Sequence, residues 1–226
     1  MGAALLRAAH EDLGGPKIYY AALPAYWRRQ PQVRAVAEAP MAAARLAGLV
    51  ERGERLRSTW TGGSLPTPSG RFSFRSAASA AEIDSLVARV AEPEILTGVE
   101  TARVVAGVDL ARDPLAWLAG PVENWRVALD GGNPVGIAGT VADACFPMIA
   151  YRGLLDEPAN GGTGQSGTAR YGAARGDLLA DAVGVLAAGG AYEVVADVDA
   201  YRVTVVAELE RTGFRRIRSR VVFAPA

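Results

Sequence analysis

The clearest repeat of hydrophobic positions lies in the C-terminal part of the chain. Apolar side chains recur there at helical spacing, at Leu178, Leu179, Ala182, Val183 and Leu186. Asp177 and Asp181 fall on another face of the same segment, and Gly189 and Gly190 follow it. This pattern predicts an amphipathic helix that buries one face and ends at the glycine pair.

Three further elements are expected after this helix. Tyr192–Val198 is typical of a short strand and Phe214–Phe223 of a last strand. Between them, valines favour a strand. Asp199 as N-cap and Gly213 as C-terminal stop instead favour a helix over Tyr201–Thr212. Propensity alone leaves this choice open.

The last predicted strand carries three arginines on one face, at Arg216, Arg218 and Arg220, because side chains alternate along a strand. They have two interpretations. They mark a charged edge strand that resists aggregation, or they form a basic rim for an acidic ligand.

The middle of the chain alternates strand and helix patterns. Its clearest feature is a hairpin, in which the turn Asp130–Asn133 joins two short alternating runs. The expected elements are, in order, strand Arg71–Arg75, helix Ala81–Val90 capped by Ser76 or Ser79, a short helix near Asp113–Leu118, strands Trp125–Leu129 and Val135–Val141, and a third antiparallel strand within Phe146–Leu155.

The first 61 residues are predicted to be a helical extension. Helices are expected over Ala3–Leu13 and Gln32–Arg57, and Pro40 kinks or divides the second. Four aromatic residues between them either pack this extension onto the main domain or wall a pocket: Tyr19, Tyr20, Tyr26 and Trp27. Gly and Pro in residues 62–70 predict a linker. Residues 71–226 then form the main domain.

Composition excludes several classes of protein. The formal net charge of zero argues against bulk attraction to nucleic acid or to a membrane surface. One cysteine and one histidine exclude a disulfide framework and a cysteine zinc cluster, and no metal site is expected. No apolar run of about 18 residues and no signal peptide are present, so we expect a cytoplasmic protein.

A run of small residues precedes the amphipathic helix. It reads Tyr171-Gly172-Ala173-Ala174-Arg175-Gly176, and Arg170 comes just before it. If this run is a turn at the mouth of the helix, free backbone N–H groups and the positive end of the helix dipole meet there. Small side chains allow close approach of a phosphate, so the run predicts an anion site.

This stretch resembles the acyl-CoA core of the GNAT superfamily of N-acetyltransferases, whose phosphate loop reads Gln/Arg-x-x-Gly-x-Gly/Ala. Gly172 and Ala174 fit that loop, while the basic residue comes one place late, at Arg170. The Leu178-Leu179 pair also fits the family, as does the Gly213-Phe214 pair. The likeness is specific over about residues 166–215. Over residues 70–160 it extends to the order of elements only.

The resemblance implies an α/β fold with a mixed sheet, that of a GNAT-like acyl-CoA N-acyltransferase, preceded by the helical N-terminal region. It also implies acetyl-CoA or another acyl-CoA as co-substrate, bound by residues 170–176, and an acetyl or short acyl group passed to a small-molecule amine. In the family the third antiparallel strand splays from the next parallel strand, and the pantetheine arm bonds to the exposed backbone. The family's final strand is expected from the N-terminal region or from a second subunit, as in a homodimer.

The catalytic groups follow less directly. Asp156 and Glu157 are the candidate bases, because they end the strand that splays. The family's usual tyrosine acid is replaced by Leu209, so Tyr201 or Tyr171 is the candidate acid. Two other readings stay open. One is a catalytically silent module that binds CoA or another ligand, and the other is a different reaction such as acyl-CoA decarboxylation or hydrolysis.

Overall fold

The computed structural model describes residues 1–64, 67–110, 112, 115, 121–142, 146–155 and 165–226. Its α-helices are α1 Gly2–Asp12, α2 Pro31–Leu46, α3 Ala80–Val87, α4 Val99–Val105, α5 Gln165–Ala188 and α6 Val203–Arg211. Short 3₁₀ turns are η1 Trp27–Arg29 and η3 Val122–Asn124. Its strands are β1 Tyr19–Pro24, β2 Leu49–Trp60, β3 Ser73–Ser76, β4 Ile95–Leu96, β5 Trp125–Asp130, β6 Asn133–Val141, β7 Met148–Leu154, β8 Val194–Asp199 and β9 Arg215–Pro225.

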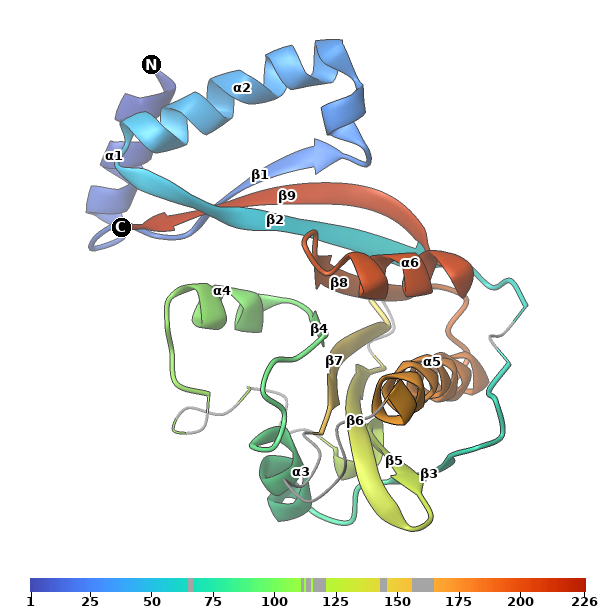
Figure 1. Cartoon of the computed structure of the whole chain (residues 1–226). Helices are drawn as coiled ribbons and strands as arrows, with labels where there is room; N and C mark the ends of the chain where they lie inside the picture. Colours follow the sequence, from blue (N-terminus) through green and yellow to red (C-terminus); the bar gives the residue numbers. More distant parts are fainter. Residues whose placement is uncertain (65–66, 111, 113–114, 116–120, 143–145, 156–164) are drawn as a thin grey trace.

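The described strands form one mixed sheet (Figure 1). Its order is β1-β9-β2-β8-β7-β6-β5-β3, and β4 pairs with β7 beside this path. The pairs are antiparallel except β7 with β8, which run parallel. The crossover from β7 to β8 contains α5, as a parallel pair requires.

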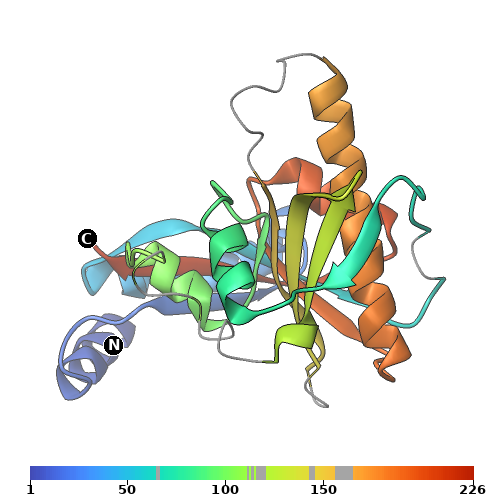
Figure 2. The same cartoon turned by 90° about the horizontal axis from the view of Figure 1, so that it is seen from below.

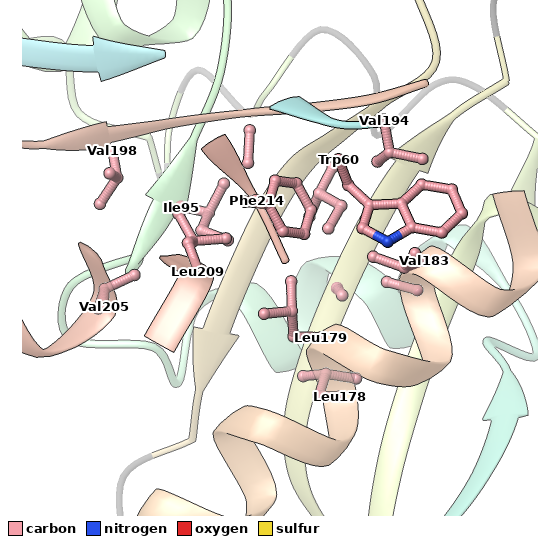
Figure 3. Close-up of a cluster of buried hydrophobic side chains, with 14 of the residues drawn as sticks. Trp60, Ile95, Leu178, Leu179, Val183, Val194, Val198, Val205, Leu209 and Phe214 are labelled. Carbon is pink, nitrogen blue, oxygen red and sulfur yellow. The ribbon is translucent and has the colours of Figure 1, made fainter. Parts of the chain in front are cut away.

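Helices α5, α6 and α2 cover one face of this sheet (Figures 1 and 2). Side chains that alternate along the strands pack beneath them. Under α5 and α6 the core includes Trp60, Val194, Val198 and the α6 residue Leu209 (Figure 3). Under α2, Met41 packs on Phe223 and its neighbours. Fully burying one such side chain contributes about 1.5–3 kcal/mol.

Helix α3 covers the opposite face of the sheet. Ile83 and Leu86 of α3 pack there on Trp125 and Val127 of β5 and on Tyr151 of β7. Within the described residues, no helix is both long enough and apolar enough to cross a membrane.

Most of the expected elements are confirmed. The hairpin of β5 and β6 turns through Gly131 and Gly132, both at positive φ, which suits the twist of paired strands. Ser79 caps α3 by accepting from the N–H of Glu82. Residues Tyr201–Thr212 contain the helix α6, although Arg202, not Asp199, precedes its first turn. The short helix expected at Asp113–Leu118 lies outside the described residues, apart from residue 115.

The second expected N-terminal helix is wrong in its last third. Helix α2 ends at Leu46, Gly48 turns the chain at a φ of 88°, and residues 49–60 form β2. Strand β2 lies between β8 and β9, antiparallel to both. Tertiary pairing explains the error, because Arg55 and Arg57 look solvated in the sequence but pair with Asp199 and Asp197 on β8.

Strand β2 fills the place of the last strand that the resemblance left open. Of the two expected sources, the N-terminal region supplies it, so a second subunit is not needed for this purpose. Helices α1 and α2 agree with the predicted helical extension, while β1 and β2 join that extension to the sheet of residues 71–226. Residues 62–70 connect β2 to β3.

The expected arrangement of arginines on β9 is also wrong. Strand β9 is not an edge strand, because β1 and β2 flank it. Ser58 is opposite Arg216 and Arg57 is opposite Arg218, so Ile217 is an extra residue in β9. The side chain of Arg216 therefore reaches Glu210 on the α6 face, whereas Arg220 reaches Asp197 on the other face.

Candidate functional site

The parallel strands β7 and β8 separate soon after they begin. They pair only through Met148 with Val195 and Ile149 with Ala196. Beyond these pairs their C-terminal halves diverge, which confirms the splay implied by the resemblance. In open α/β sheets, ligands bind beyond the carboxyl ends of parallel strands that separate in this way.

Strand β4 lies in the gap between the splayed strands. The N–H groups of Glu94 and Thr97 donate to the carbonyls of Arg152 and Ala150, each at 2.8 Å. The hydroxyl of Thr97 donates to the carbonyl of Ile149 at 2.9 Å, and the N–H of Asp197 donates to that hydroxyl at 3.2 Å. One short segment therefore bridges β7 to β8 across the gap.

This arrangement corrects one expectation. The resemblance implies exposed backbone groups on β7 for a pantetheine arm, but the carbonyls of Ala150 and Arg152 already accept bonds from the β4 segment. Buried backbone groups need partners, and here the chain itself supplies them. In this arrangement the gap does not fit a pantetheine arm, and the β4 segment would have to leave to admit one.

Four charged side chains form a buried cluster at the same place. Arg152 of β7 is fully buried and donates to both carboxylate oxygens of Glu208 on α6, at 3.1 and 3.0 Å. Its Nη2 lies 3.1 Å from a carboxylate oxygen of Glu94, just before β4. Arg175 of α5 donates to the other oxygen of Glu94 at 2.5 Å. The two arginines and two carboxylates balance in charge, as buried ions must.

Burial raises the pKa of Glu208 above its ordinary value, and the charge of Glu94 raises it further. Arg152 and Arg175 oppose this rise without cancelling it. A buried carboxylate with a raised pKa that links elements on both sides of a gap is a candidate proton acceptor. The cluster residues come from β7, α5, α6 and the position just before β4, and we call them the Arg152 cluster below.

The expected phosphate-binding turn is not a turn. Helix α5 begins at Gln165, so Tyr171–Gly176 lie in its second to fourth turns. The run of Ala and Arg favours helix strongly enough to include Gly172 and Gly176. The free N–H groups of α5 are those of residues 165–168, before the predicted site. A role for residues 170–176 in phosphate binding stays a prediction.

Arg175, one of the residues in this run, already has other partners. Arg175 is held by Glu94 in the Arg152 cluster, and its own carbonyl accepts from Arg152 at 3.2 Å. Ala174 is buried, and Gly172 is exposed. Arg170, Tyr171 and Ala173 also lie within the helix, as residues of α5.

The predicted catalytic residues do not meet at the Arg152 cluster. Asp156 and Glu157 lie outside the described residues. Tyr201 precedes α6, is 66% exposed and donates its hydroxyl proton to Glu92. Partial burial and this hydrogen bond raise the pKa of Tyr201. Leu209, which replaces the tyrosine acid of the family, is fully buried in the core (Figure 3). A proton donor at this position would not reach a substrate.

Sequence reasoning missed the Arg152 cluster. A weak signal was present, since Arg152 interrupts an otherwise apolar strand and Glu208 sits beside the buried Leu209. Their pairing spans 56 residues, so spacing alone does not reveal it. Within the described residues, no group of three or more His, Cys, Asp and Glu side chains could hold a metal ion.

Solved structures share this fold at low sequence identity. A GCN5-related N-acetyltransferase from Sphaerobacter thermophilus aligns over 92% of this chain and 59% of its own, with 16% identity and a TM-score of 0.56. A GCN5-related N-acetyltransferase from Kribbella flavida aligns over 97% and 72%, with 14% identity and a TM-score of 0.55. A GNAT-family acetyltransferase from Colwellia psychrerythraea aligns over 99% and 72%, with 9% identity and a TM-score of 0.51.

The chain thus spans about three fifths of the length of the Sphaerobacter protein. No family model matches the sequence, and no curated protein matches it. Identities this low show the fold alone. The chain has the fold of the GCN5-related N-acetyltransferases.

Proposed function

We propose that this protein is an acyl-CoA-dependent N-acyltransferase that passes an acetyl or short acyl group to a small-molecule amine. The observation that carries the proposal is the splay of β7 and β8 with the buried Glu208 facing it on this fold. An acyl-CoA would supply the activated acyl group. The chain would supply a base for the amine proton.

Glu208 is the base favoured by the described residues, because its pKa is raised and Arg152 fixes its position. A base positioned in this way contributes about 10²- to 10⁴-fold to rate. Asp156 and Glu157 stay alternative bases, and Tyr201 stays a candidate acid. The proposal includes a cytoplasmic location and no nucleic-acid or membrane partner. Because β2 supplies the last strand of the fold, the absence of that strand is no longer a reason to expect a homodimer.

The test is product analysis. The protein is incubated with acetyl-CoA and a panel of small amines, and free CoA and acylated amine are measured by mass spectrometry. We expect Glu208→Gln to lower kcat by about 10²-fold or more. Glu210→Gln, on the same helix but facing away from Arg152, should keep the wild-type kcat. Absence of acylated product with every amine, or an unchanged kcat in Glu208→Gln, counts against the proposal.

A second candidate function is favoured by one observation. The β4 segment occupies the gap, and Arg152 already pairs with both Glu94 and Glu208 without a ligand. A catalytically silent or repurposed module on this fold accounts for both facts. It predicts that no acyl product forms, and calorimetry with acetyl-CoA then separates a module that binds CoA from one that does not. Released free acid or a decarboxylated acyl-CoA would point to a different reaction.

A further inference from the structure

A separate cavity lies on the far side of α6 from the Arg152 cluster. Its volume is about 350 Å³, and η1, β2, β9 and α6 contribute to its wall. The α6 residues Val203, Val206, Ala207 and Glu210 line it and share one helical face. Glu208 points the other way, toward Arg152. The cavity, which we call the η1–α6 cavity, is therefore distinct from the candidate active site.

The floor of the η1–α6 cavity is apolar. Leu56 of β2 and Val206 of α6 form it and are both buried, whereas Ala207 is exposed. Val203 stands at the rim and is 70% exposed. A floor of this kind with a few polar groups at its edge is the usual composition of a small-molecule site.

Positive charge is in excess around this floor. Three arginines line the cavity, Arg28, Arg29 and Arg216, against two carboxylates. Glu210 pairs with Arg216 at 3.1 Å. Among the described residues, no carboxylate forms an ion pair with Arg29. The Nε of Arg216 is buried and has no hydrogen-bond partner within the described part of the chain. Arg29 is exposed, so its charge is solvated and is not paired with a carboxylate of the described residues.

The other carboxylate, Glu54, is already engaged by three donors. It accepts hydrogen bonds from Trp27 Nε1 at 2.9 Å, from Arg28 Nε at 2.8 Å and from the hydroxyl of Ser219. Burial acts to raise the pKa of Glu54, but these three bonds outweigh it and lower that pKa. Glu54 therefore stays ionised and fixes η1, and it leaves the excess charge on Arg29 unopposed.

Tyr26 adds a strained residue to the wall. Its φ is 57°, the left-handed region that a bulky side chain rarely adopts. The guanidinium carbons of Arg216 and Arg29 lie 4.6 and 5.4 Å from the centre of its ring, and its hydroxyl donates to Glu210 at 3.3 Å. Backbone strain that the surroundings hold in place concentrates at ligand sites.

We propose that the η1–α6 cavity binds a small organic anion with an apolar body, of the monocarboxylate class. The carboxylate accepts hydrogen bonds from the exposed guanidinium of Arg29, as guanidinium groups bind carboxylates in a planar fork, and the charge of Arg216 in the cavity wall adds to the attraction. The apolar body rests on Leu56, Val206 and the Tyr26 ring. A ligand cation is disfavoured because three arginines surround the opening.

The test uses 3-phenylpropionate as the probe and 3-phenylpropanamide, its neutral isostere, as the control. Calorimetry on the full chain without acyl-CoA should show the acid binding at least about tenfold more tightly than the amide. Val203→Asp places a negative charge at the exposed rim and should weaken acid binding about tenfold. Val203→Asn, of the same size without the charge, should keep it.

A second pair of variants localises the site. Arg216→Met should reduce the preference for the acid, and Arg218→Met, an exposed arginine of β9 outside the cavity, should leave it intact. Glu208→Gln should bind the probe like wild type, so this result is independent of acyl transfer. The proposal is overturned if the acid does not bind, if acid and amide bind equally, or if Val203→Asp binds like Val203→Asn.

Discussion

At the scale of single residues, Tyr26 shows how side-chain contacts hold a backbone conformation that costs free energy. A non-glycine residue in the left-handed region costs about 1–2 kcal/mol relative to right-handed backbone. The hydrogen bond to Glu210 and the contacts with two arginines offset part of that cost. Strain and contacts can be separated, because alanine and glycine both remove the ring but only glycine accepts the backbone.

We therefore expect Tyr26→Ala to unfold more easily than Tyr26→Gly, by about 1 kcal/mol. Both variants lose the same ring contacts, so the difference reports the backbone alone. Urea unfolding of the two variants and the wild type measures it. Equal stability of the two variants would show that Tyr26 does not hold a left-handed backbone in solution.

Glu82 ties stability to pH. Hydrogen bonds from Arg75 and from the N–H of Ala78 lower the pKa of Glu82 from 4.5 to about 2. The folded pKa is depressed, so this contribution is complete above pH 4.5 and is lost as pH falls toward 2. Because Arg75 is partly exposed, solvent screening reduces the contribution to about 1 kcal/mol.

Glu82→Gln should accordingly lose about 1 kcal/mol of stability at pH 7 and match the wild type near pH 2. Unfolding by urea at a series of pH values gives the two curves. Glu11→Gln, an exposed residue of α1, serves as the control and should run parallel to the wild type. A constant gap between wild type and Glu82→Gln down to pH 2 would contradict the ion-pair account.

At the scale of elements, local signals predicted well where local chemistry decides. Gly131 and Gly132 define the β5–β6 hairpin, and Gly213 ends α6 at a φ of 89°. Local signals failed where pairing with a distant part of the chain decides the structure. Residues 49–57 carry charges suited to an exposed helix, yet Arg57 finds Asp197 across the sheet. The β4 segment is only two residues long, too short for any periodicity to indicate it.

Strand β4 makes a prediction about access to the gap. Thr97 is fully buried, and its hydroxyl links the carbonyl of Ile149 to the N–H of Asp197. Thr97→Val keeps the shape and removes both bonds, which should destabilise the closed arrangement by about 1–3 kcal/mol. If acyl-CoA enters as β4 leaves, each 1.4 kcal/mol lost from the closed state tightens the apparent Kd for acetyl-CoA about tenfold.

Thr59→Val is the matched control. Thr59 is equally buried on β2, but its hydroxyl has no hydrogen-bond partner among the described residues. Removing an unpartnered hydroxyl should leave stability unchanged or slightly raised, and acetyl-CoA affinity unchanged. Calorimetry with acetyl-CoA on both variants decides the question. An unchanged or weaker affinity in Thr97→Val would mean that β4 stays in place when CoA binds.

At the scale of the whole molecule, the class of fold was predictable and the path of the chain was not. The order of elements from residue 71 to residue 223 indicates the mixed sheet, because each element has its own pattern. The insertion of β2 between β8 and β9 leaves no local trace, since its partners lie more than 130 residues away. The Arg152 cluster escaped prediction for the same reason, as its four members come from separate parts of the chain.

The placement of β2 makes a prediction about connectivity. Leu49 pairs with Pro225, so β2 begins where β9 ends, as in a hairpin without its turn. The two termini lie on the same side of the molecule in both views (Figures 1 and 2), and Arg7 of α1 reaches the carbonyl of Leu46 just before β2. A permuted chain that begins at residue 62, runs to Ala226 and continues through a short glycine–serine linker into residues 1–61 keeps every strand pair. We expect it to unfold cooperatively at a urea midpoint close to that of the wild type.

Residues 62–226 alone should not fold. Without β2, the edges of β8 and β9 lose their partners, and the buried Asp197 keeps Arg220 but loses Arg57. Leaving a buried carboxylate with too few partners costs about 3–5 kcal/mol, a large share of the 5–15 kcal/mol that stabilises a typical domain. Circular dichroism and urea unfolding compare the two chains. A cooperative transition in residues 62–226 alone would show that the first 61 residues are an accessory to the sheet, whereas folding of the permuted chain alone would establish β2 as an integral strand whose position in the sequence is free.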